Sequence, residues 1–145
     1  MSKEQFSRWL MGFIDAEGNF QVYLDRGYLR VMFRIRLHVD DIQVLYKIRD
    51  FLGVGRVKSC RTNCVFIISN LHELHTVLIP LIYKYRLFTT KWLDFMDFRL
   101  VVNQIREAGT SKLTSAQLAW AISIIEGMNS TRHTYNYSII PKAII

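Results

Sequence analysis

The chain has 145 residues, which is enough for one domain with a sizeable core and too few for a second large module. Half of the residues are apolar, a share that excludes a disordered or low-complexity protein. Lys and Arg number 19 against 12 Asp and Glu, and the resulting charge of +7 favours a polyanionic partner, either nucleic acid or an anionic membrane surface.

The sequence gives no support for secretion or for membrane insertion. Its two cysteines, Cys60 and Cys64, cannot build a disulfide framework. The apolar stretch near the start contains Asp15 and Glu17, which a signal-peptide core would not. The longest uncharged apolar stretch, residues 77–83, is too short to cross a bilayer. We therefore expect a soluble protein of a reducing compartment, with no signal peptide and no membrane partner.

The first part of the chain is predicted to form a helix and two strands. Ser2 and Gln5 have the spacing of a capping box, apolar residues then recur at helical period, and Gly18 stands where the helix would end. From residue 19 the apolar period changes to two. This predicts strands over 19–24 and 30–37, joined by turn-forming residues.

A second helix and a second hairpin follow. Asp40 or Asp41 is expected to cap a helix that stops at Gly53. Residues 56–60 and 65–69 are predicted strands. The last of these strands is apolar on both faces, so the pattern leaves its inner side open.

The remainder of the chain is predicted to be helical. Pro80 is expected to break or restart the first helix of this part. No linker or biased segment divides the sequence, so residues 1–145 are treated as a single domain, an α+β fold with an antiparallel sheet of about four strands. Asn70 is expected to cap a helix over 71–78, and Thr90 a helix over 91–107. Thr114 forms a capping box with Gln117 at the start of a helix over 115–128.

One face of the predicted sheet is polar and basic. Arg30, Arg34 and Arg36 share one side of a strand. Arginine forks bind phosphates or the O6/N7 edge of guanine, Asn and Gln match adenine, and a two-stranded ribbon fits the major groove. A solvated sheet face is the alternative, although a row of like charges is costly without a partner. The residues expected to contact nucleic acid are Asn19, Gln21, Tyr23, Tyr28, Arg30, Arg34, Arg36, Arg56 and Lys58.

The end of the first helix combines small residues with a carboxylate. Gly12 and Ala16, four residues apart, form a stripe that allows a second helix to approach closely. Glu17 follows at the helix terminus. Two such helices packed together would bring two Glu17 carboxylates side by side, and paired carboxylates suit a hard cation such as Mg²⁺. The alternative is a solvated acidic helix end.

Residues 10–18, LMGFIDAEG, resemble the LAGLIDADG motif of homing endonucleases at nearly every position. The similarity extends through residues 37–41 and 53–57 to the helix start at Thr90 and Lys91. The predicted αββαββα order agrees with the half-domain of that family, in which a sheet saddle lies in the DNA major groove. The resemblance implies a site-specific DNA endonuclease that hydrolyses phosphodiester bonds in both strands of a long, near-palindromic site.

The resemblance also implies roles for individual residues. Glu17 would bind the catalytic metal together with the backbone carbonyl of Ala16, and Lys91 would be the basic residue that supports cleavage. Two or more Mg²⁺ ions per dimer would be held in this way. The family often places a Gln near the metal-bound water, whereas this chain has Leu37 and His38 in that region. The residues expected at the dimer interface are Trp9, Gly12, Phe13 and Ala16.

The sequence contains one copy of the motif, which requires a homodimer unless the chain is one half of a longer two-motif protein. Residues 128–132 resemble the junction after a repeat in two-motif members, and the segment from Leu118 is expected to be a core helix. The family implies an origin in a mitochondrial or chloroplast intron. Two other functions stay open: a splicing cofactor that binds intron RNA without cutting DNA, and a DNA-binding regulator.

Several other patterns favour structural roles. His72 and His75 have the spacing of metal ligands on a helix, but no further ligand is near in sequence, and Cys60 and Cys64 lack the two further ligands that zinc needs. Asp15 is expected to act at the helix end or behind the metal ligands. The aromatic residues expected in the core are Trp92, Phe95 and Phe98.

Overall fold

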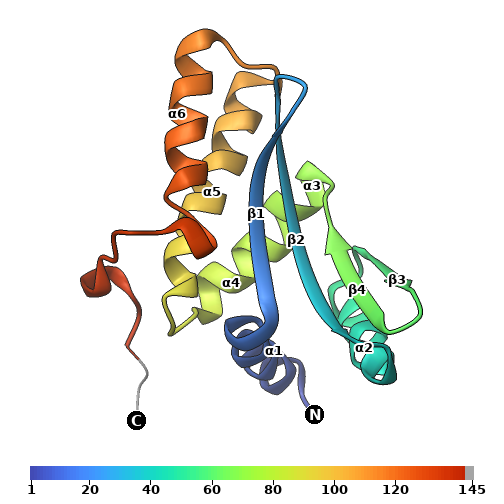
Figure 1. Cartoon of the computed structure of the whole chain (residues 1–145). Coiled ribbons are helices and arrows are strands. Elements are labelled where there is room, and N and C mark those ends of the chain that lie inside the picture. The colour runs from blue at the N-terminus through green and yellow to red at the C-terminus, as the bar shows by residue number, and fades with distance from the viewer. Residues whose placement is uncertain (143–145) are drawn as a thin grey trace.

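The computed structural model describes residues 1–142 and shows a four-stranded antiparallel sheet with helices packed on one face (Figure 1). This confirms the predicted α+β class and its αββαββα order. The main elements are α1 (Lys3–Glu17), β1 (Gly18–Asp25), β2 (Tyr28–His38), α2 (Ile42–Leu52), β3 (Arg56–Ser59), β4 (Asn63–Ile68), α3 (Leu71–Glu73), α4 (Ile79–Tyr85), α5 (Lys91–Ala108) and α6 (Ser115–Glu126).

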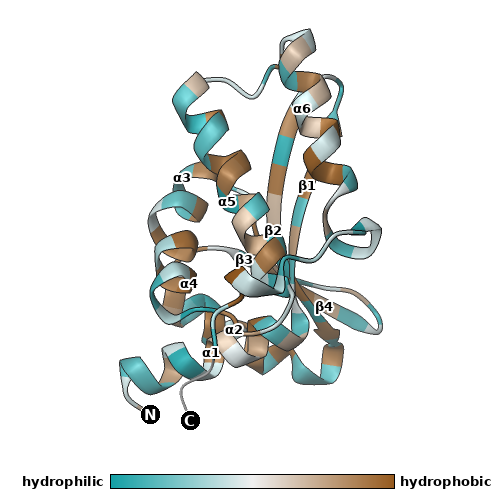
Figure 2. Ribbon diagram, turned by 90° about the vertical axis from the view of Figure 1, so that its left-hand side faces the viewer, coloured by the Kyte–Doolittle hydropathy of each residue, from teal (hydrophilic) through white to brown (hydrophobic). Residues whose placement is uncertain are grey.

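The strands lie in the order β1-β2-β4-β3, and their register sets which side chains share a face. Asn19 pairs with Arg34, and Arg36 and Lys58 both pair with Val65. Bands of hydrophilic and hydrophobic residues alternate along β1 and β2 (Figure 2), as expected for strands with one face on a core.

The second hairpin differs slightly from its prediction. β3 ends at Ser59 rather than Cys60, and β4 begins at Asn63 rather than Val65 and ends at Ile68 rather than Ser69. The structure also decides the side of β4 that the sequence left open. Cys64, Phe66 and Ile68 are buried against the helices. The residues between them therefore belong to the opposite face of the sheet, which the helices do not cover and which is called the outer face below.

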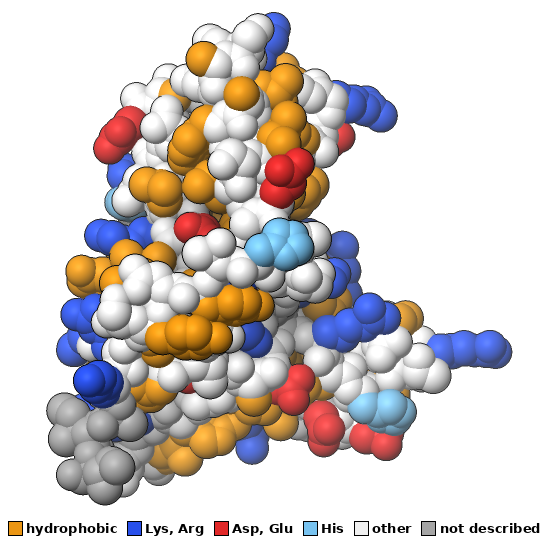
Figure 3. Space-filling model, turned by 60° about the vertical axis from the view of Figure 1, so that its left-hand side comes forward, with side chains coloured by type: hydrophobic (Ala, Val, Ile, Leu, Met, Phe, Trp, Pro, Cys, Tyr) orange, Lys and Arg blue, Asp and Glu red, His pale blue; other side chains and the backbone are white. Residues whose placement is uncertain are grey.

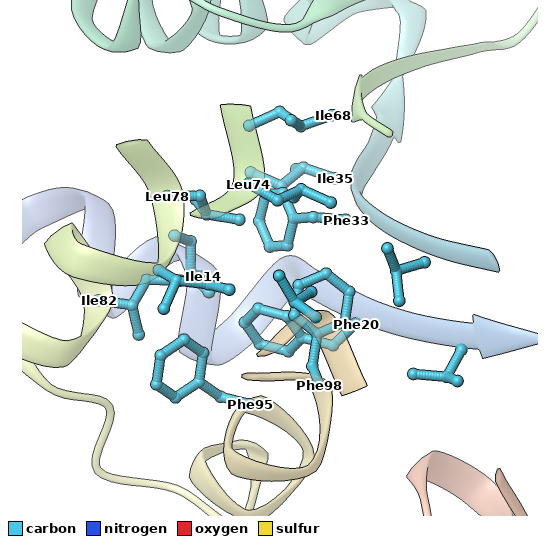
Figure 4. Close-up of a cluster of buried hydrophobic side chains, with 14 of the residues drawn as sticks. Ile14, Phe20, Phe33, Ile35, Ile68, Leu74, Leu78, Ile82, Phe95 and Phe98 are labelled. Atoms are coloured by element: carbon cyan, nitrogen blue, oxygen red, sulfur yellow. The ribbon is translucent and has the colours of Figure 1, made fainter. Parts of the chain in front are cut away.

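The core lies between the sheet and helices α1, α4 and α5. Phe20 and Phe33 from the strands meet Phe95 and Phe98 of α5, with the ring centroids of Phe20 and Phe98 5.3 Å apart (Figure 4). All four side chains are fully buried. The predicted core role of Trp92, Phe95 and Phe98 is therefore confirmed.

Helix caps follow the sequence in part. The capping boxes Ser2–Gln5 and Thr114–Gln117 are both formed, and Asn70 accepts a hydrogen bond from the Glu73 N–H. The prediction that Asp40 or Asp41 caps α2 is wrong, because a 3₁₀ turn over Val39–Asp41 precedes the helix and Asp41 makes no side-chain cap.

The predicted Thr90 cap is also wrong. Thr90 already has helical dihedrals (φ −59°, ψ −13°), so its hydroxyl is not placed to accept from the first turn. The Thr89 hydroxyl takes this role and accepts a hydrogen bond from the Lys91 N–H at 3.2 Å.

Pro80 stands in the first turn of α4, so the prediction that it breaks or restarts this helix is confirmed as a restart. A π-helical turn over Leu74–Leu78 links α3 directly to α4, with the Ile79 N–H bonded to the Leu74 carbonyl. An α-helical turn would direct the proline ring against the carbonyl of Thr76 and leave that carbonyl without its donor. The wider turn relieves this conflict, and π-bulges of this kind are known inside helices.

The segment after α6 returns to the body of the domain. The Asn129 side chain donates to the carbonyl of Phe20, next to the outer edge of β1. Arg132 forms ion pairs with Asp94 and Asp97 of α5. The free edge of β1 is covered where this segment crosses it, which limits unwanted strand pairing. Within residues 1–142, no helix has both the length and the apolarity needed to cross a bilayer.

Candidate nucleic-acid interface and metal site

Glu17 lies at the junction where α1 turns directly into β1. A Cβ at Gly18 would stand 2.8 Å from Ile14 Cγ2 and 3.2 Å from Phe33 Cε1, so only glycine fits between helix and sheet. This close approach leaves no connecting loop, and Glu17 is exposed at the edge of the outer sheet face.

Asp15 anchors the loop that precedes α5. Its carboxylate accepts hydrogen bonds from the backbone N–H of Phe88 (2.9 Å) and from the N–H (3.3 Å) and hydroxyl (2.6 Å) of Thr89. The expectation that Asp15 acts at the helix end rather than as a free ligand agrees with these bonds. They fix the start of α5, and therefore Lys91, relative to Glu17.

Lys91 is half-buried at the first position of α5. Burial lowers the pKa of its amine, and the charges of Asp15, Asp94 and Glu17 act in the opposite direction. The Lys91 amine is therefore close enough to Glu17 for the charge of that carboxylate to act on it.

The outer face of the sheet gathers the residues predicted to contact nucleic acid. Asn19, Gln21 and Tyr23 of β1 stand beside Arg34, Met32 and Arg30 of β2 in the strand register. A hollow of about 340 Å³ lies on this face, and its lining includes Arg34, Arg36 and Lys58. Among residues 1–142 these three cations have no ion-pair partner. A surface with several unneutralised cations favours a polyanion.

Other members of the predicted contact set are already engaged within the chain. Arg30 lies 3.8 Å from the Asp25 carboxylate, and its guanidinium stands 5.1 Å from the centre of the Tyr28 ring. Arg56 donates to the Ser69 hydroxyl at 3.3 Å. The Oδ1 atom of Asn19 is shielded from solvent without a partner among the described residues, as expected for an acceptor that a ligand or an ordered water would satisfy.

The predicted interface residues form one exposed stripe on α1. Trp9 and Phe13 stack at 5.0 Å, and Trp9 is 38% exposed. A Cβ placed on Gly12 would have no atom within 4 Å. Nothing within the described chain therefore requires a glycine at this position, whereas a second helix packed on it would.

The donors near Glu17 fit a hard divalent cation. Its carboxylate supplies oxygen ligands, and the Ala16 carbonyl belongs to the last turn of α1, where carbonyls lack an intrahelical donor. Among residues 1–142 no three His, Cys, Asp or Glu side chains cluster as a metal site. His38 is occupied elsewhere, because its Nδ1 accepts from the Asp40 N–H at 3.2 Å.

Sequence reasoning missed part of this surface. Asn63, Val65 and Ile67 of β4 also face outward. Val65 and Ile67 are apolar, so the sequence pattern could not distinguish the inner from the outer side of this strand. The histidine and cysteine pairs agree with the structural roles expected for them. Cys64 is buried with its thiol directed to the His38 carbonyl (3.4 Å), and His75 Nε2 lies 2.8 Å from the Arg106 guanidinium.

Comparison with known proteins decides the family. Residues 10–102 match the family described as LAGLIDADG endonuclease. The chain belongs to this family. The match includes the α1 motif, all four strands and the first two-thirds of α5, and so every element that positions Glu17 and Lys91.

Individual relatives support this assignment. The chain is 29% identical over 128 residues to the probable intron-encoded endonuclease 3 of Neurospora crassa, covering 81% of this chain and 24% of that protein. It is 27% identical over 104 residues to the uncharacterized mitochondrial protein RF1 of Saccharomyces cerevisiae, covering 70% and 22%.

A solved structure of the same family has a similar fold. The homing endonuclease I-GzeII, crystallised in complex with its DNA target, superposes with a TM-score of 0.81 at 30% identity, over 88% of this chain and 45% of that one. The chain therefore spans less than half of this solved relative and about a quarter of the two curated ones.

Proposed function

We propose that this LAGLIDADG chain supplies one half of a site-specific DNA endonuclease that cuts both strands of a long, near-palindromic site. The observation that carries the proposal is the position of Glu17. It stands exposed where the free stripe of α1 meets the cationic outer face of the sheet. A duplex lying on that face would pass beside Glu17, and a second α1 helix would bring a second carboxylate to the same place.

The second half is proposed to be another copy of this chain, because one motif is present and Gly12 faces open space. Small residues at positions 12 and 16 would allow the two helices to approach closely. The solved relative is about twice as long, so a second repeat in one polypeptide is the competing arrangement. Residues 1–145 would form one domain in either case.

Mg²⁺ is the proposed cofactor, held by the Glu17 carboxylate and the Ala16 carbonyl of each half, giving two or more ions per complete enzyme. When bound, it would activate water and stabilise the leaving oxygen of a phosphodiester. Lys91 would place its amine against the charge that develops on the phosphate. Asp15 would keep Lys91 in position through the loop at Thr89.

The outer face would hold and select the DNA. Arg34, Arg36 and Lys58 are free of carboxylates and would contact phosphates or base edges. Asn19 and Gln21 carry amide groups that match adenine edges. Because RF1 is described as a mitochondrial protein, we propose a mitochondrial rather than a chloroplast origin.

The test compares the wild-type chain with Glu17→Gln on a supercoiled plasmid library carrying randomised inserts, incubated with Mg²⁺ or with EDTA. Wild type should cut a defined subset of plasmids only with Mg²⁺, and Glu17→Gln should bind the same subset without cutting. Glu107→Gln, an exposed change at the far end of α5, is the matched control and should cut normally. Cutting by Glu17→Gln would remove this residue from the mechanism. Specific binding by the wild type without any cutting would favour a splicing cofactor or a DNA-binding regulator instead.

A further inference from the structure

A second group of cations lies on the helical side of the domain and is organised by one aromatic ring. The guanidinium groups of Arg86 and Arg99 stand 4.6 and 4.5 Å from the centre of the Tyr83 ring. Arg86 also lies 5.4 Å from the ring of Trp92. Tyr83, Arg86 and Arg99 are called the Tyr83 cluster below.

The Tyr83 cluster is separated from the outer sheet face by the core. Phe20 points inward from β1, Phe95 meets it from α5, and Trp92 lies between Phe95 and Tyr83, with each neighbouring pair of rings 5.0 to 6.2 Å apart. A duplex on the outer face therefore cannot reach the cluster through the sheet. Figure 3 shows Lys and Arg side chains at both edges of the view, with apolar, uncharged and acidic side chains between them.

The two arginines of the cluster lack the partners that surface cations usually have. Among residues 1–142, neither Arg86 nor Arg99 forms an ion pair. Arg49 on α2 is a useful contrast, since it lies over Tyr46 but is also paired with Asp50 at 3.1 Å. Two like charges around one ring repel each other, and a polyanion that contacts both would offset that repulsion.

Arg86 occupies a backbone conformation that disfavours it. Its dihedrals are φ 75° and ψ 151°, a region that is almost confined to glycine. The residue directly after α4 is where a glycine is commonly found. Keeping an arginine there costs folding free energy and holds its guanidinium over Tyr83 and Trp92. Residues held in sparsely populated backbone conformations of this kind cluster at functional sites.

We propose that the Tyr83 cluster binds the phosphodiester backbone of a single-stranded nucleic acid, at the same time as duplex DNA occupies the sheet. Guanidinium groups stacked on a ring keep their N–H edges free for bidentate phosphate contacts. Tyr83 is exposed, so its ring and the guanidinium groups that lie over it can be reached from solvent. Aromatic rings interleaved with cations are the composition of single-strand binding surfaces.

The proposal is tested with fluorescein-labelled 30-nucleotide single strands of one mixed sequence, as RNA and as DNA, and with the corresponding duplex DNA. The full chain is titrated at several KCl concentrations and binding is followed by anisotropy. Arg86→Gln/Arg99→Gln should weaken single-strand binding about tenfold and reduce the slope of log K against log salt by about 1.4, as expected for two lost phosphate contacts. Duplex affinity should change less than twofold. If RNA binds more tightly than DNA, the natural ligand of the cluster is RNA; if DNA binds more tightly, it is single-stranded DNA.

Two further variants separate binding from folding. Arg86→Gly should raise or leave unchanged the melting temperature, because it relieves the positive φ, and should still weaken single-strand binding. Arg49→Gln should leave single-strand binding unchanged. The proposal is overturned if Arg86→Gln/Arg99→Gln binds single strands like wild type, if it weakens duplex binding equally, or if Arg49→Gln has the same effect. None of these outcomes depends on cleavage, so the proposed endonuclease function is judged separately.

Discussion

The hydroxyl of Thr89 donates a 2.6 Å hydrogen bond to the carboxylate of Asp15, 74 residues earlier in the chain. Asp15 belongs to the last turn of the motif helix, and Thr89 lies in the loop before α5. The bond therefore joins the element that presents Glu17 to the element that presents Lys91. The backbone N–H groups of Phe88 and Thr89 donate to the same carboxylate, so Asp15 holds this junction through three hydrogen bonds.

Asp15→Ala is expected to impair both stability and cleavage. The substitution leaves three donors without their acceptor and should lower the free energy of unfolding by about 1–3 kcal/mol. Cleavage should fall at least tenfold at temperatures where the variant is fully folded, because Lys91 is no longer fixed. Urea unfolding and plasmid cutting measure the two effects. Asp50→Ala, which removes one exposed ion pair, should change stability by less than about 1 kcal/mol. Normal cutting by folded Asp15→Ala would show that its bonds are purely structural.

Gly12→Leu should separate folding from association. Its side chain enters open space in the single chain, and replacing a helical glycine should raise the free energy of unfolding by about 0.5–1 kcal/mol. The same side chain would block a second α1 helix, so light scattering should find monomers at concentrations where the wild type forms dimers. Gly18→Ala is the contrasting variant and should destabilise the fold, because its Cβ would meet Ile14 and Phe33. An unchanged dimer in Gly12→Leu would place the interface elsewhere.

Arg34→Ala and Lys58→Ala should affect DNA binding differently. Arg34 lies at the centre of the sheet beside Asn19, and its fork can read a base edge, whereas Lys58 on edge strand β3 would contact phosphate. Arg34→Ala should reduce the discrimination between bases at one position of the site by about 1–3 kcal/mol. Lys58→Ala should weaken binding to all DNA sequences alike. Selection from randomised duplexes, followed by sequencing, measures both. Equal losses on cognate and scrambled duplexes for both variants would contradict this division.

Arg132→Ala should be among the most destabilising single changes in the chain. The Arg132 and Asp94 side chains are only 11% and 13% exposed, and burial raises the pKa of Asp97 while its bond to Arg132 opposes the rise. Removing the cation leaves two carboxylates largely buried and should cost about 3 kcal/mol or more. Without the Arg132 bond the pKa of Asp97 should rise further above 3.8, so the stability of the variant should increase as pH falls through the raised pKa of Asp97. A loss below about 1 kcal/mol, or the opposite pH trend, would rule out this account.

His75 should make folding sensitive to mild acid. Burial lowers its pKa below 6.5, and the nearby Arg106 and His72 lower it further. Between the native pKa and 6.5, the unfolded chain binds a proton that the folded chain does not. The free energy of unfolding should therefore fall as pH drops through this window. The free energy of unfolding is measured by denaturant titration at several pH values. His75→Gln should reduce its dependence on pH, whereas His72→Gln, at an exposed position, should leave most of that dependence in place. The same flattening in both variants would assign the effect to another group.

The local elements were predictable because their signals are local. A capping box needs only Ser2 and Gln5 at the right spacing, and alternation along β2 separates Arg34 from its buried neighbours without knowledge of the rest of the fold. The predictions that failed are those where a neighbouring residue competes. Thr89 replaces Thr90 as the cap, and a 3₁₀ turn capped by His38 precedes α2 in place of the Asp40 or Asp41 cap.

By itself, the sequence determined the α+β order, the motif helix with Glu17 at its end, and the row of cations on one sheet face. Each of these depends on residue spacing within a single element. Only the tertiary structure decided the inner side of β4, the attachment of Asp15 to Thr89, the return of Arg132 to α5 and the pairing of Arg86 with Arg99 on Tyr83. These features join residues that are distant in the chain, and their energies arise from burial and contact geometry, which spacing along the chain does not encode.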